Sequence, residues 1–428
     1  MRRIELTPRP DWRSRLDAVG FSFYDLESEG GRPYWNESAA YVFTMPEIEL
    51  LEQATTELFA RCMEAVEFVV RQGRFDEFGI PERFHELVRA SWDDDDPTVY
   101  GRFDLAYDGA GTVTLLEFNA DTPTSLVETA AAQWQWLEEQ TAAGSLPVGA
   151  DQFNGLHELL IEQWEHIRTA RWGLAPGARL HLASLHDTGD GELIVEDFDT
   201  VAYMAETAAA AGFDPKLIFM EDVSWSVDDN VFLDGDDEPI RRIFKLYPWE
   251  WMLAEQFGGF LPASRGATQW VEPAWKLLLS NKQLLVVLWE LFPGHPNLLP
   301  AFATPDALAG RAHVAKPRLG REGANVRLVD ASGGVIASAP GAYGDEGFVF
   351  QERARFAPIP GKTAVIGSWI VGETPAGIDL RETSGPITGD LAEFVPHYID
   401  PDQPDPADRD PDDSDPQPPH PHPTEETS

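Results

Sequence analysis

Two short segments near residue 110 carry polar side chains at every second position. Arg102 and Asp104 lie in the first segment, and Glu117 and Asn119 lie in the second. Side chains two apart on a strand share a face, so each pair points the same way. Two carboxylates and an amide oxygen form a hard ligand set that suits Mg²⁺, and an arginine beside them can hold a phosphate or an oxyanion. The alternative is a solvated strand face with one ordinary Arg–Asp pair.

A hydroxyl-rich turn follows the second segment and leads into a helix expected over residues 124–139. Its Thr122 and Thr124, together with exposed backbone N–H groups, can bind an anionic substrate group. Ordinary capping of the helix N-terminus by either threonine explains the same residues, and one turn can serve both purposes.

Two lysines and a loop with glycines form a second group of candidates. Lys282 opens an apolar helix expected over 283–292, and Lys316 ends a strand that is followed by Gly320 and Gly323. Lysine charge and close backbone approach at glycine are a common way to hold the phosphates of ATP. The loop is neither a Walker A sequence nor a GxGxxG motif, and a plain hairpin turn explains its glycines equally well.

Two segments near the end of the body carry the last candidates. An apolar strand ends in Gln351 and Glu352, and its backbone can read the edge of an adenine base. Further on, Arg381 can stabilise phosphoryl transfer as a cationic clamp. The alternative for this arginine is a surface salt bridge with Glu382 or Asp379.

The polar residues around position 110 need a β-hairpin to bring them together. Residues 100–107 and 112–118 are expected to be its two strands, joined by a turn with two glycines. Such a hairpin gathers the four polar side chains on one surface. Leu116 and Phe118 are expected to face the other way, into the core.

The rest of the body alternates helices and strands, which predicts α/β or α+β architecture. A long helix begins at Pro46, with apolar residues at helical spacing through Val69. Cys62 lies on that apolar stripe and is expected to be a core thiol. Short apolar strands are expected at 180–185, 216–220, 240–246, 348–352 and 367–371, with a helix at 201–211.

The chain of 428 residues has 73 acidic against 32 basic residues, a net charge of −41. Nucleic acid and anionic membranes are therefore not expected as partners, whereas a cationic partner such as a polyamine would be attracted. A generally acidic, soluble surface is the simpler explanation of the charge. One cysteine excludes an internal disulfide, and neither a signal peptide nor a membrane-spanning run is seen, so the cytoplasm is the expected compartment.

The last segment, residues 401–428, differs in kind from the body. It contains nine prolines and seven aspartates and has no large apolar residue. It cannot repay the entropy lost on ordering, so we expect a disordered acidic tail.

Several segments together resemble the synthetase domain of glutathionylspermidine synthase. They are YGRFDLAYDG and LLEFNADTPTSLVE within 100–128, FKLYPWEW at 244–251, NKQLLVVLWELFPGHPNLL at 281–299, KPRLGREGANV at 316–326, and GSWIVG and IDLRE within 367–382. The similarity runs from Asp11 to Ile399 with the motifs in one order. It is closest to the stand-alone branch, so the cysteine-dependent amidase domain of the bifunctional enzymes is expected to be absent.

The resemblance implies an α+β fold of the ATP-grasp type. Mixed and antiparallel sheets, flanking helices and a lid at roughly 300–345 would make up a body of residues 1–400. Most ATP-grasp enzymes carry the nucleotide lysines before the metal motif. Here Glu117-Phe118-Asn119 precedes Lys282 and Lys316, so the order is circularly permuted, as in the family it resembles.

The resemblance also implies a role for each candidate. Asp104, Glu117 and Asn119 would hold Mg²⁺; Lys282, Lys316, Gly320 and Gly323 would contact the phosphates of ATP; Gln351 and Glu352 would lie near the adenine; Arg102 and Arg381 would stabilise an acyl-phosphate; Thr122 and Thr124 would lie near a peptide acid. Leu246 stands where the well-known enzymes carry a polar residue, which argues against glutathione itself as the acid.

The implied activity is an ATP- and Mg²⁺-dependent ligase that joins a peptide-like acid to an amine, with a polyamine as one candidate. A phosphotransferase on the same scaffold, without an amine acceptor, remains open. A nucleotide-binding protein without catalysis also remains open, although the charged candidate residues argue against it. The oligomeric state cannot be read from the sequence.

Overall fold

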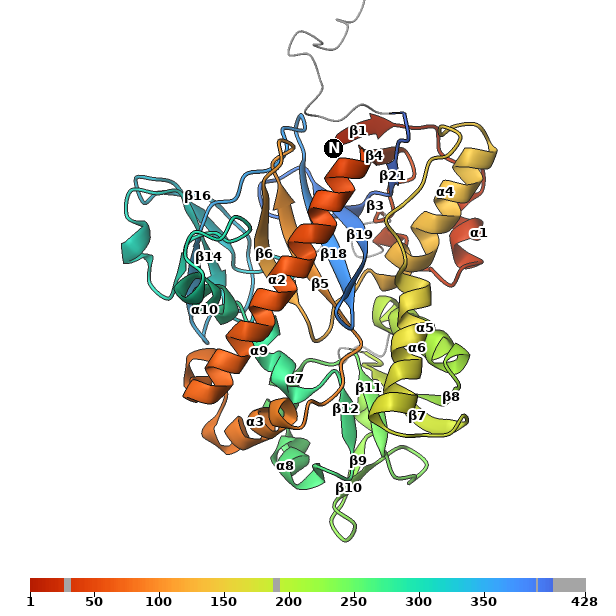
Figure 1. The fold of residues 1–428 in the computed structure, drawn as a ribbon, viewed down its shortest axis with the longest axis vertical. Coiled ribbons are helices and arrows are strands. Elements are labelled where there is room, and N and C mark those ends of the chain that lie inside the picture. Colours follow the sequence, from red (N-terminus) through yellow and green to blue (C-terminus); the bar gives the residue numbers. More distant parts are fainter. Residues whose placement is uncertain (27–31, 188–192, 390–391, 403–428) are drawn as a thin grey trace, which may run out of the picture.

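The computed structural model describes residues 1–26, 32–187, 193–389 and 392–402. Helices and β-sheets are mixed, which confirms the α+β class (Figure 1). The expected acidic tail lies outside the described residues except for Pro401 and Asp402. Within the described residues, no helix combines the length and the apolar character that crossing a bilayer requires.

The central sheet joins the predicted hairpin to strands from the end of the body. Its order is β20-β19-β18-β5-β6, and every neighbouring pair is antiparallel. The strands are β5 Tyr100–Tyr107, β6 Val113–Asn119, β18 Thr363–Val371, β19 Thr374–Thr383 and β20 Glu393–Phe394. The candidates near residue 110 and those near residue 380 therefore share one sheet.

A second sheet is parallel and has the order β12-β11-β7-β8. Its strands are β7 Ala178–Ser184, β8 Phe213–Phe219, β11 Arg242–Lys245 and β12 Gln269–Val271, and α6 Val195–Ala210 connects β7 to β8. A crossover helix is what parallel neighbours require. The expected strands at 180–185, 216–220 and 240–246 are confirmed, and the helix begins six residues before the predicted 201.

A third sheet lies on the opposite side of the central sheet from α4 (Figure 1). Its order is β13-β17-β14-β15-β16 and all its pairs are antiparallel. The strands are β13 Ala301–Phe302, β14 His313–Pro317, β15 Arg327–Val329, β16 Val335–Ser338 and β17 Phe348–Glu352. Helix α10, Gln283–Leu291, contacts β13 and β17. This sheet contains the segment predicted as a lid.

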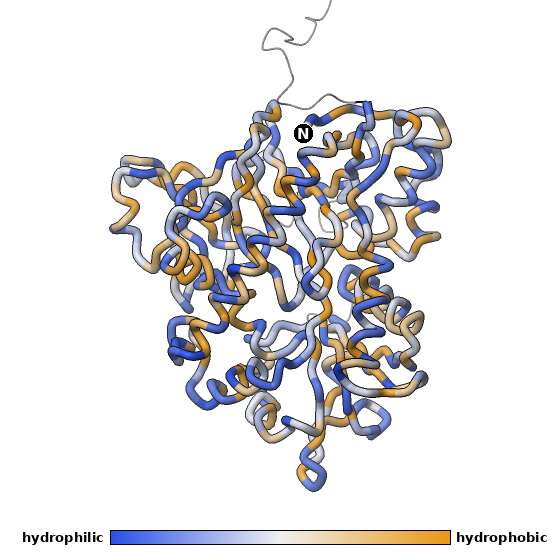
Figure 2. Tube along the Cα trace, viewed as in Figure 1, coloured by the Kyte–Doolittle hydropathy of each residue, from blue (hydrophilic) through white to orange (hydrophobic). Residues whose placement is uncertain are grey.

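The long helix predicted from Pro46 is α2, Met45–Gln72, and it packs on the central sheet. Thr44 and Glu47 form a capping box at its start, and Gly73 ends it in the left-handed conformation. Hydrophilic and hydrophobic residues alternate along it at helical spacing (Figure 2). Cys62 is fully buried on its apolar side, as predicted, and burial raises the pKa of its thiol.

The remaining elements complete the framework. Helices are α1 Trp12–Asp17, α3 His85–Asp93, α4 Gln133–Ala142, α5 Leu156–His166, α7 Trp249–Ala254, α8 Leu261–Ser264 and α9 Leu277–Ser280. Short strands are β1 Arg2–Glu5, β2 Asp25–Leu26, β3 Arg32–Pro33, β4 Ala39–Phe43, β9 Ser224–Ser226, β10 Val231–Leu233 and β21 His397–Ile399. A π-helical stretch, Glu128–Ala132, precedes α4, so the helix predicted over 124–139 forms with an irregular first turn.

Candidate active site

The hairpin places its four polar residues as strand alternation predicts. Arg102 pairs with Asn119 and Asp104 pairs with Glu117 across β5 and β6. Directly opposed residues on neighbouring strands hold their side chains on the same face. The predicted gathering of two carboxylates, an amide and an arginine is therefore confirmed.

A β-bulge changes the expectation for Leu116. The register slips between Asp104 and Leu105, so Leu116 is an extra residue of β6. Its side chain is half-buried and lines the cavity described next, so the prediction that it faces the core is wrong. Phe118 does face the core, where its ring stacks on Phe103 with 3.8 Å between centroids.

One cavity of about 250 Å³ lies beside this strand face. All the residues predicted from the sequence to form a site line it: Arg102, Asp104, Glu117, Asn119, Thr122, Thr124, Lys282, Lys316, Gly320, Gly323, Gln351, Glu352 and Arg381. They come from the central sheet, the third sheet and the loops between them. The fold thus brings together five stretches of sequence that lie up to about 280 residues apart.

Asp104 is the common partner of the two arginines. Its Oδ1 accepts a hydrogen bond from Arg102 Nε at 3.0 Å, and its Oδ2 accepts one from Arg381 Nη2. Arg102 Nη1 also donates to the backbone carbonyl of Thr124. Burial alone would raise the pKa of the Asp104 carboxyl, but the two guanidinium groups outweigh it and lower that pKa. The carboxyl is therefore ionised at neutral pH.

Arg381 does not lie on the surface in a salt bridge with Glu382, which was one alternative. Adjacent strand residues point to opposite faces, and Glu382 instead binds Arg3 and Tyr41. Arg381 turns toward the cavity, with its Nε 3.9 Å from Asp379 Oδ1. The alternative of a surface ion pair is therefore wrong, although Asp379 is a neighbour.

Lys282 links the hairpin to the glycine loop. Its ammonium group lies 2.9 Å from Glu117 Oε2 and donates to the backbone carbonyl of Gly320 at 2.5 Å. Burial would raise the pKa of the Glu117 carboxyl, but Lys282 reverses the effect and the net shift is downward. Glu117 is therefore also ionised at neutral pH.

Lys316, at the end of β14, is nearly buried under the cavity. Its ammonium group donates to the carbonyl of Leu116 at 2.9 Å, on the bulge, and to Gln351 Oε1 at 2.8 Å. Burial lowers the pKa of Lys316 to about 8. Gln351 thus holds this lysine in place through a hydrogen bond. Glu352 instead forms an ion pair with Arg311 at 2.8 Å.

The loop between the two glycines contributes a residue that sequence reasoning did not single out. Arg321 donates from Nη1 to Thr122 Oγ1 at 2.9 Å and from Nη2 to Glu250 Oε1 at 2.8 Å. Gly323 has a φ of 68°, and a Cβ there would lie 2.5 Å from the carbonyl oxygen of Thr388. Close packing and backbone conformation both require this glycine. The available signal was an arginine between two loop glycines.

A group of three acids beside Thr124, of which Glu128 is buried and the other two are half-buried, was also missed. Glu128, in the π-helical stretch, accepts a hydrogen bond from Tyr34 at 2.9 Å. Burial and the nearby Glu196 raise the pKa of Glu128 to about 8, and the same two causes raise that of Asp197 to about 7. Glu196 itself interacts with the Thr124 side chain. Glu128 lies before α4, whereas Glu196 and Asp197 lie in α6, so no local pattern in the sequence reveals the group.

A buried ion pair holds the turn that carries Thr122 and Thr124 in place. Asp121 accepts from Lys245 Nζ at 2.6 Å and from the backbone N–H of Trp249 at 2.9 Å. Both charged side chains are at most 1% exposed. Leu246, next to this lysine, is buried in the core and does not line the cavity.

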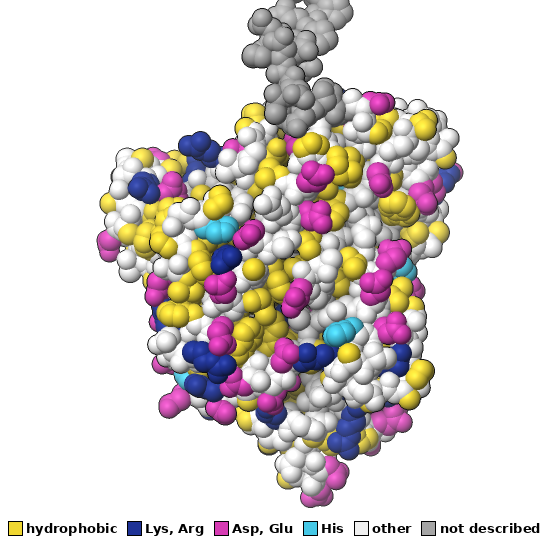
Figure 3. Space-filling model, viewed as in Figure 1, with side chains coloured by type: hydrophobic (Ala, Val, Ile, Leu, Met, Phe, Trp, Pro, Cys, Tyr) yellow, Lys and Arg dark blue, Asp and Glu magenta, His cyan; other side chains and the backbone are white. Residues whose placement is uncertain are grey.

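The oxygen donors fit a magnesium ion. Asp104, Glu117 and Asn119 present hard oxygens from one strand face, and both carboxyls are ionised. The charge of the cavity fits a phosphate chain, because six basic residues outnumber four acidic ones along its lining. These are Arg102, Lys282, Lys316, Arg321, Arg353 and Arg381 against Asp104, Glu117, Glu322 and Glu352. Over the visible face of the molecule, by contrast, acidic side chains are widely spread (Figure 3).

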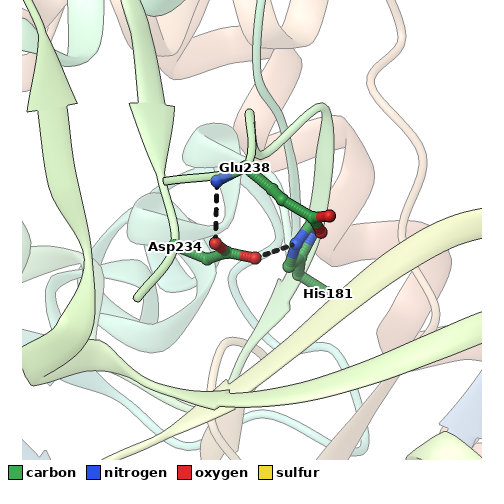
Figure 4. A group of neighbouring side chains, drawn as sticks. All are labelled: His181, Asp234 and Glu238. Atoms are coloured by element: carbon green, nitrogen blue, oxygen red, sulfur yellow. Dashed lines mark hydrogen bonds and ion pairs between the residues drawn. The ribbon is translucent and has the colours of Figure 1, made fainter. Parts of the chain in front are cut away.

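A second charged cluster lies in the parallel-sheet region (Figure 4). His181, Asp234 and Glu238 have the spacing of metal ligands, and His181 Nε2 lies 3.0 Å from Asp234 Oδ2. The ammonium group of Lys216 contacts this oxygen at 2.6 Å, as well as Asp236 at 2.8 Å and Glu238 at 3.2 Å. The cation for these carboxylates is therefore a side chain of the protein.

Comparison with known families decides what kind of protein holds this cavity. The model of the glutathionylspermidine synthase preATP-grasp family matches residues 3–400. The chain belongs to this family. Its members are ATP-dependent acid–amine ligases, so the predicted enzyme class and the resemblance are both confirmed.

Individual relatives of this family member agree. A Haemophilus influenzae protein, named provisionally as an acid–amine ligase, is 38% identical over 409 residues, which are 94% of this chain and 100% of the relative. Trypanothione synthetase of Crithidia fasciculata is 29% identical, and the bifunctional glutathionylspermidine synthetase/amidase of Escherichia coli is 24% identical. These matches cover 88% and 80% of this chain but only 56% of each of the two longer enzymes.

A solved structure supports the fold of this ligase. A glutathione synthetase-like effector from Globodera pallida superimposes with a TM-score of 0.52 at 9% identity. The match covers 84% of this chain and 88% of the effector. At that identity the likeness concerns the fold alone.

Proposed function

We propose that this ligase uses ATP to activate a peptide-like carboxylic acid and joins it to an amine. One observation carries the proposal: a chain of net charge −41 folds a cavity whose lining has more basic than acidic residues. Clustered positive charge against the overall charge of the chain attracts and holds a small anion. A phosphate chain and a carboxylate are such anions.

The proposal assigns a role to each group of residues that lines the cavity. Lys282, Lys316 and the loop between Gly320 and Gly323 hold the phosphates, and the strand ending at Glu352 lies beside the adenine. Asp104, Glu117 and Asn119 would hold Mg²⁺. The ion would supply charge stabilisation at the phosphoryl oxygens.

The reaction then follows from ordinary carbonyl chemistry. A carboxylate oxygen of the acid attacks the γ-phosphorus, the bond to the bridging oxygen breaks, and an acyl-phosphate and ADP result. A neutral amine attacks the acyl carbon, phosphate leaves with one oxygen of the original carboxylate, and the amine nitrogen loses a proton. Arg102 and Arg381 stabilise the charge that builds on the oxygens in both steps.

The acceptor proposed here is a cationic amine such as a polyamine. Glu128, Glu196 and Asp197 form an acidic group beside Thr124, at the edge of the positive cavity. Burial and repulsion from neighbouring acids raise the pKa values of these three carboxyls, to about 8 for Glu128 and about 7 for Asp197, and an ammonium group entering there favours their ionised forms. Thr122 and Thr124 line the cavity, where the acid would bind, and Thr124 also interacts with Glu196 of this group.

The third sheet is proposed to act as the lid, at roughly residues 300–345. The contacts of Arg321 with Thr122 and Glu250 support this, since they tie the glycine loop to the turn that carries Thr122 and to α7. Closure would exclude water that would otherwise hydrolyse the acyl-phosphate. The circularly permuted order of the motifs, with the body spanning residues 1–400, belongs to the same proposal.

The test is product analysis with a panel of substrates. The protein is incubated with Mg²⁺, ATP, short peptide acids and amines that include spermidine, and phosphate release and product mass are measured. We expect phosphate release that needs both the acid and the amine, with an amide as product. An acyl-phosphate or its hydrolysis product with every amine offered would favour the phosphotransferase instead.

A further inference from the structure

A carboxylate lies behind the two arginines of the cavity without reaching the cavity itself. Asp379 is fully buried, and its Oδ2 accepts a hydrogen bond from Trp369 Nε1 at 2.7 Å. Among the residues that the structure describes, its Oδ1 has no hydrogen-bond partner. Buried carboxylate oxygens normally have donors, so this oxygen requires an explanation.

The unpaired oxygen faces an unpaired donor. Arg381 Nε lies 3.9 Å from Asp379 Oδ1 and likewise has no hydrogen-bond partner in the described part of the chain. Arg381 uses Nη2 instead, to bind Asp104. The donor and the acceptor are therefore about 1 Å beyond the usual hydrogen-bond distance.

The sheet is built to hold this carboxylate. Asp104, Gly367 and Asp379 stand in one row across β5, β18 and β19. A Cβ at Gly367 would overlap the Asp379 carboxylate, so a glycine in the middle strand makes the space. The ring of Trp369, which donates to Asp379, lies 5.7 Å from Cζ of Arg102. Asp379 is thus close to Arg381 directly and is linked to Arg102 through Trp369.

We propose that Asp379 is a positioning residue, which accepts a hydrogen bond from Arg381 when Asp104 binds the metal ion. The inference rests on the proposed function, in which Asp104 is a ligand of Mg²⁺ and Arg381 stabilises the transferring group. Asp104 holds both arginines in this structure, and a carboxylate shared with a divalent cation is a poorer acceptor for either. Arg381 Nε then closes on Asp379 Oδ1, and its terminal nitrogens remain directed at the cavity.

The test is Asp379→Asn, in the parent and in an Arg381→Ala background. Asparagine keeps the size and an acceptor for Trp369 but removes the charge that receives Arg381. In the parent, kcat is expected to fall about 10-fold or more, while KM for ATP and the calorimetric Kd of Mg–ATP change less than about threefold. In the Arg381→Ala background the same change is expected to alter kcat less than about twofold, because its partner is gone.

Two outcomes overturn the inference: parent-like kcat of Asp379→Asn, or an equal loss of kcat in both backgrounds. If Asp379→Asn does not fold by its melting curve, Trp369→Phe frees the carboxylate without removing it. Trp369→Phe is then expected to lower kcat in the parent but not in the Arg381→Ala background, and a loss in both overturns the inference. A parent that forms no amide at all marks a failure of the proposed function instead.

Discussion

The two charged clusters of this protein differ in how far their ions are already paired. In the parallel-sheet region one ammonium group, that of Lys216, contacts Asp234, Asp236 and Glu238, so acids outnumber the cation. In the cavity two arginines share the single carboxylate of Asp104. There, basic residues outnumber acidic ones.

The difference teaches what separates a structural cluster from a binding site. Excess carboxylates around a lysine form a closed local network that binds loops together. Excess cations around a cavity give its lining a net positive charge, which attracts an anionic ligand. The spacing of residues alone, which flags His181, Asp234 and Glu238 as a ligand set, does not distinguish the two.

The largest expected effect is on turnover. Arg381→Ala is expected to lower kcat about 10²-fold or more, because the arginine acts mainly on charge that develops in the transition state. Lys216→Met, the matched removal of a cation from the other cluster, is expected to leave kcat within about twofold of the parent. Steady-state kinetics measure both. Parent-like kcat in Arg381→Ala, or similar losses in the two variants, would break the comparison.

The next effect concerns nucleotide binding. Glu117→Gln and Lys316→Ala are each expected to weaken Mg–ATP binding about 10-fold or more, because each removes a charge that meets the ion or the phosphates. Glu238→Gln makes the same chemical change in the Lys216 cluster and is expected to leave Kd unchanged. Isothermal calorimetry gives the three values. Parent-like binding by both cavity variants would show that the nucleotide site lies elsewhere.

A smaller effect should follow the titration of Lys316, whose pKa is about 8. Below that pH the ammonium form predominates and attracts phosphate; above it the neutral amine predominates. Mg–ATP affinity is therefore expected to fall about threefold or more between pH 7 and 9. Lys316→Arg, which stays charged throughout, should flatten the profile. An equal fall in both proteins would assign the titration to another group.

The smallest effect concerns the amine. Screening weakens the attraction between a polycation and the acidic group at Glu128, Glu196 and Asp197, so KM for spermidine is expected to rise about twofold or more between 0.05 and about 0.5 M salt. An uncharged amine is expected to show a flat profile. Initial rates over a salt series measure both, and identical slopes would remove the acidic group from amine binding.

The sequence predicted the face formed by Arg102, Asp104, Glu117 and Asn119 because strand alternation depends only on neighbours in the chain. It did not predict the side chain of Leu116, since a bulge depends on how β5 pairs with β6. Local patterns suggested the remaining candidates, the resemblance to a family assigned each of them a role, and the fold brings them to one cavity.

Contacts between distant elements could not be predicted in this way. Arg321 meets Thr122 and Glu250, which are 199 and 71 residues away in the chain. Asp379 entered only as an alternative salt-bridge partner of Arg381, whereas the structure shows it buried over Gly367. Such contacts follow from how the third sheet packs against the hairpin and how β18 joins β5 to β19, and no local pattern encodes that arrangement.

The central claim is that the cavity activates a carboxylate, and oxygen transfer tests it most directly. The acid identified by the substrate panel is labelled with ¹⁸O in both carboxylate oxygens and incubated with Mg–ATP, the amine and the protein. Mass spectrometry then reads the released phosphate and the product. The account predicts one ¹⁸O in the phosphate and one in the amide. Phosphate without ¹⁸O would contradict it, because water rather than the carboxylate of the acid would then have attacked the γ-phosphorus.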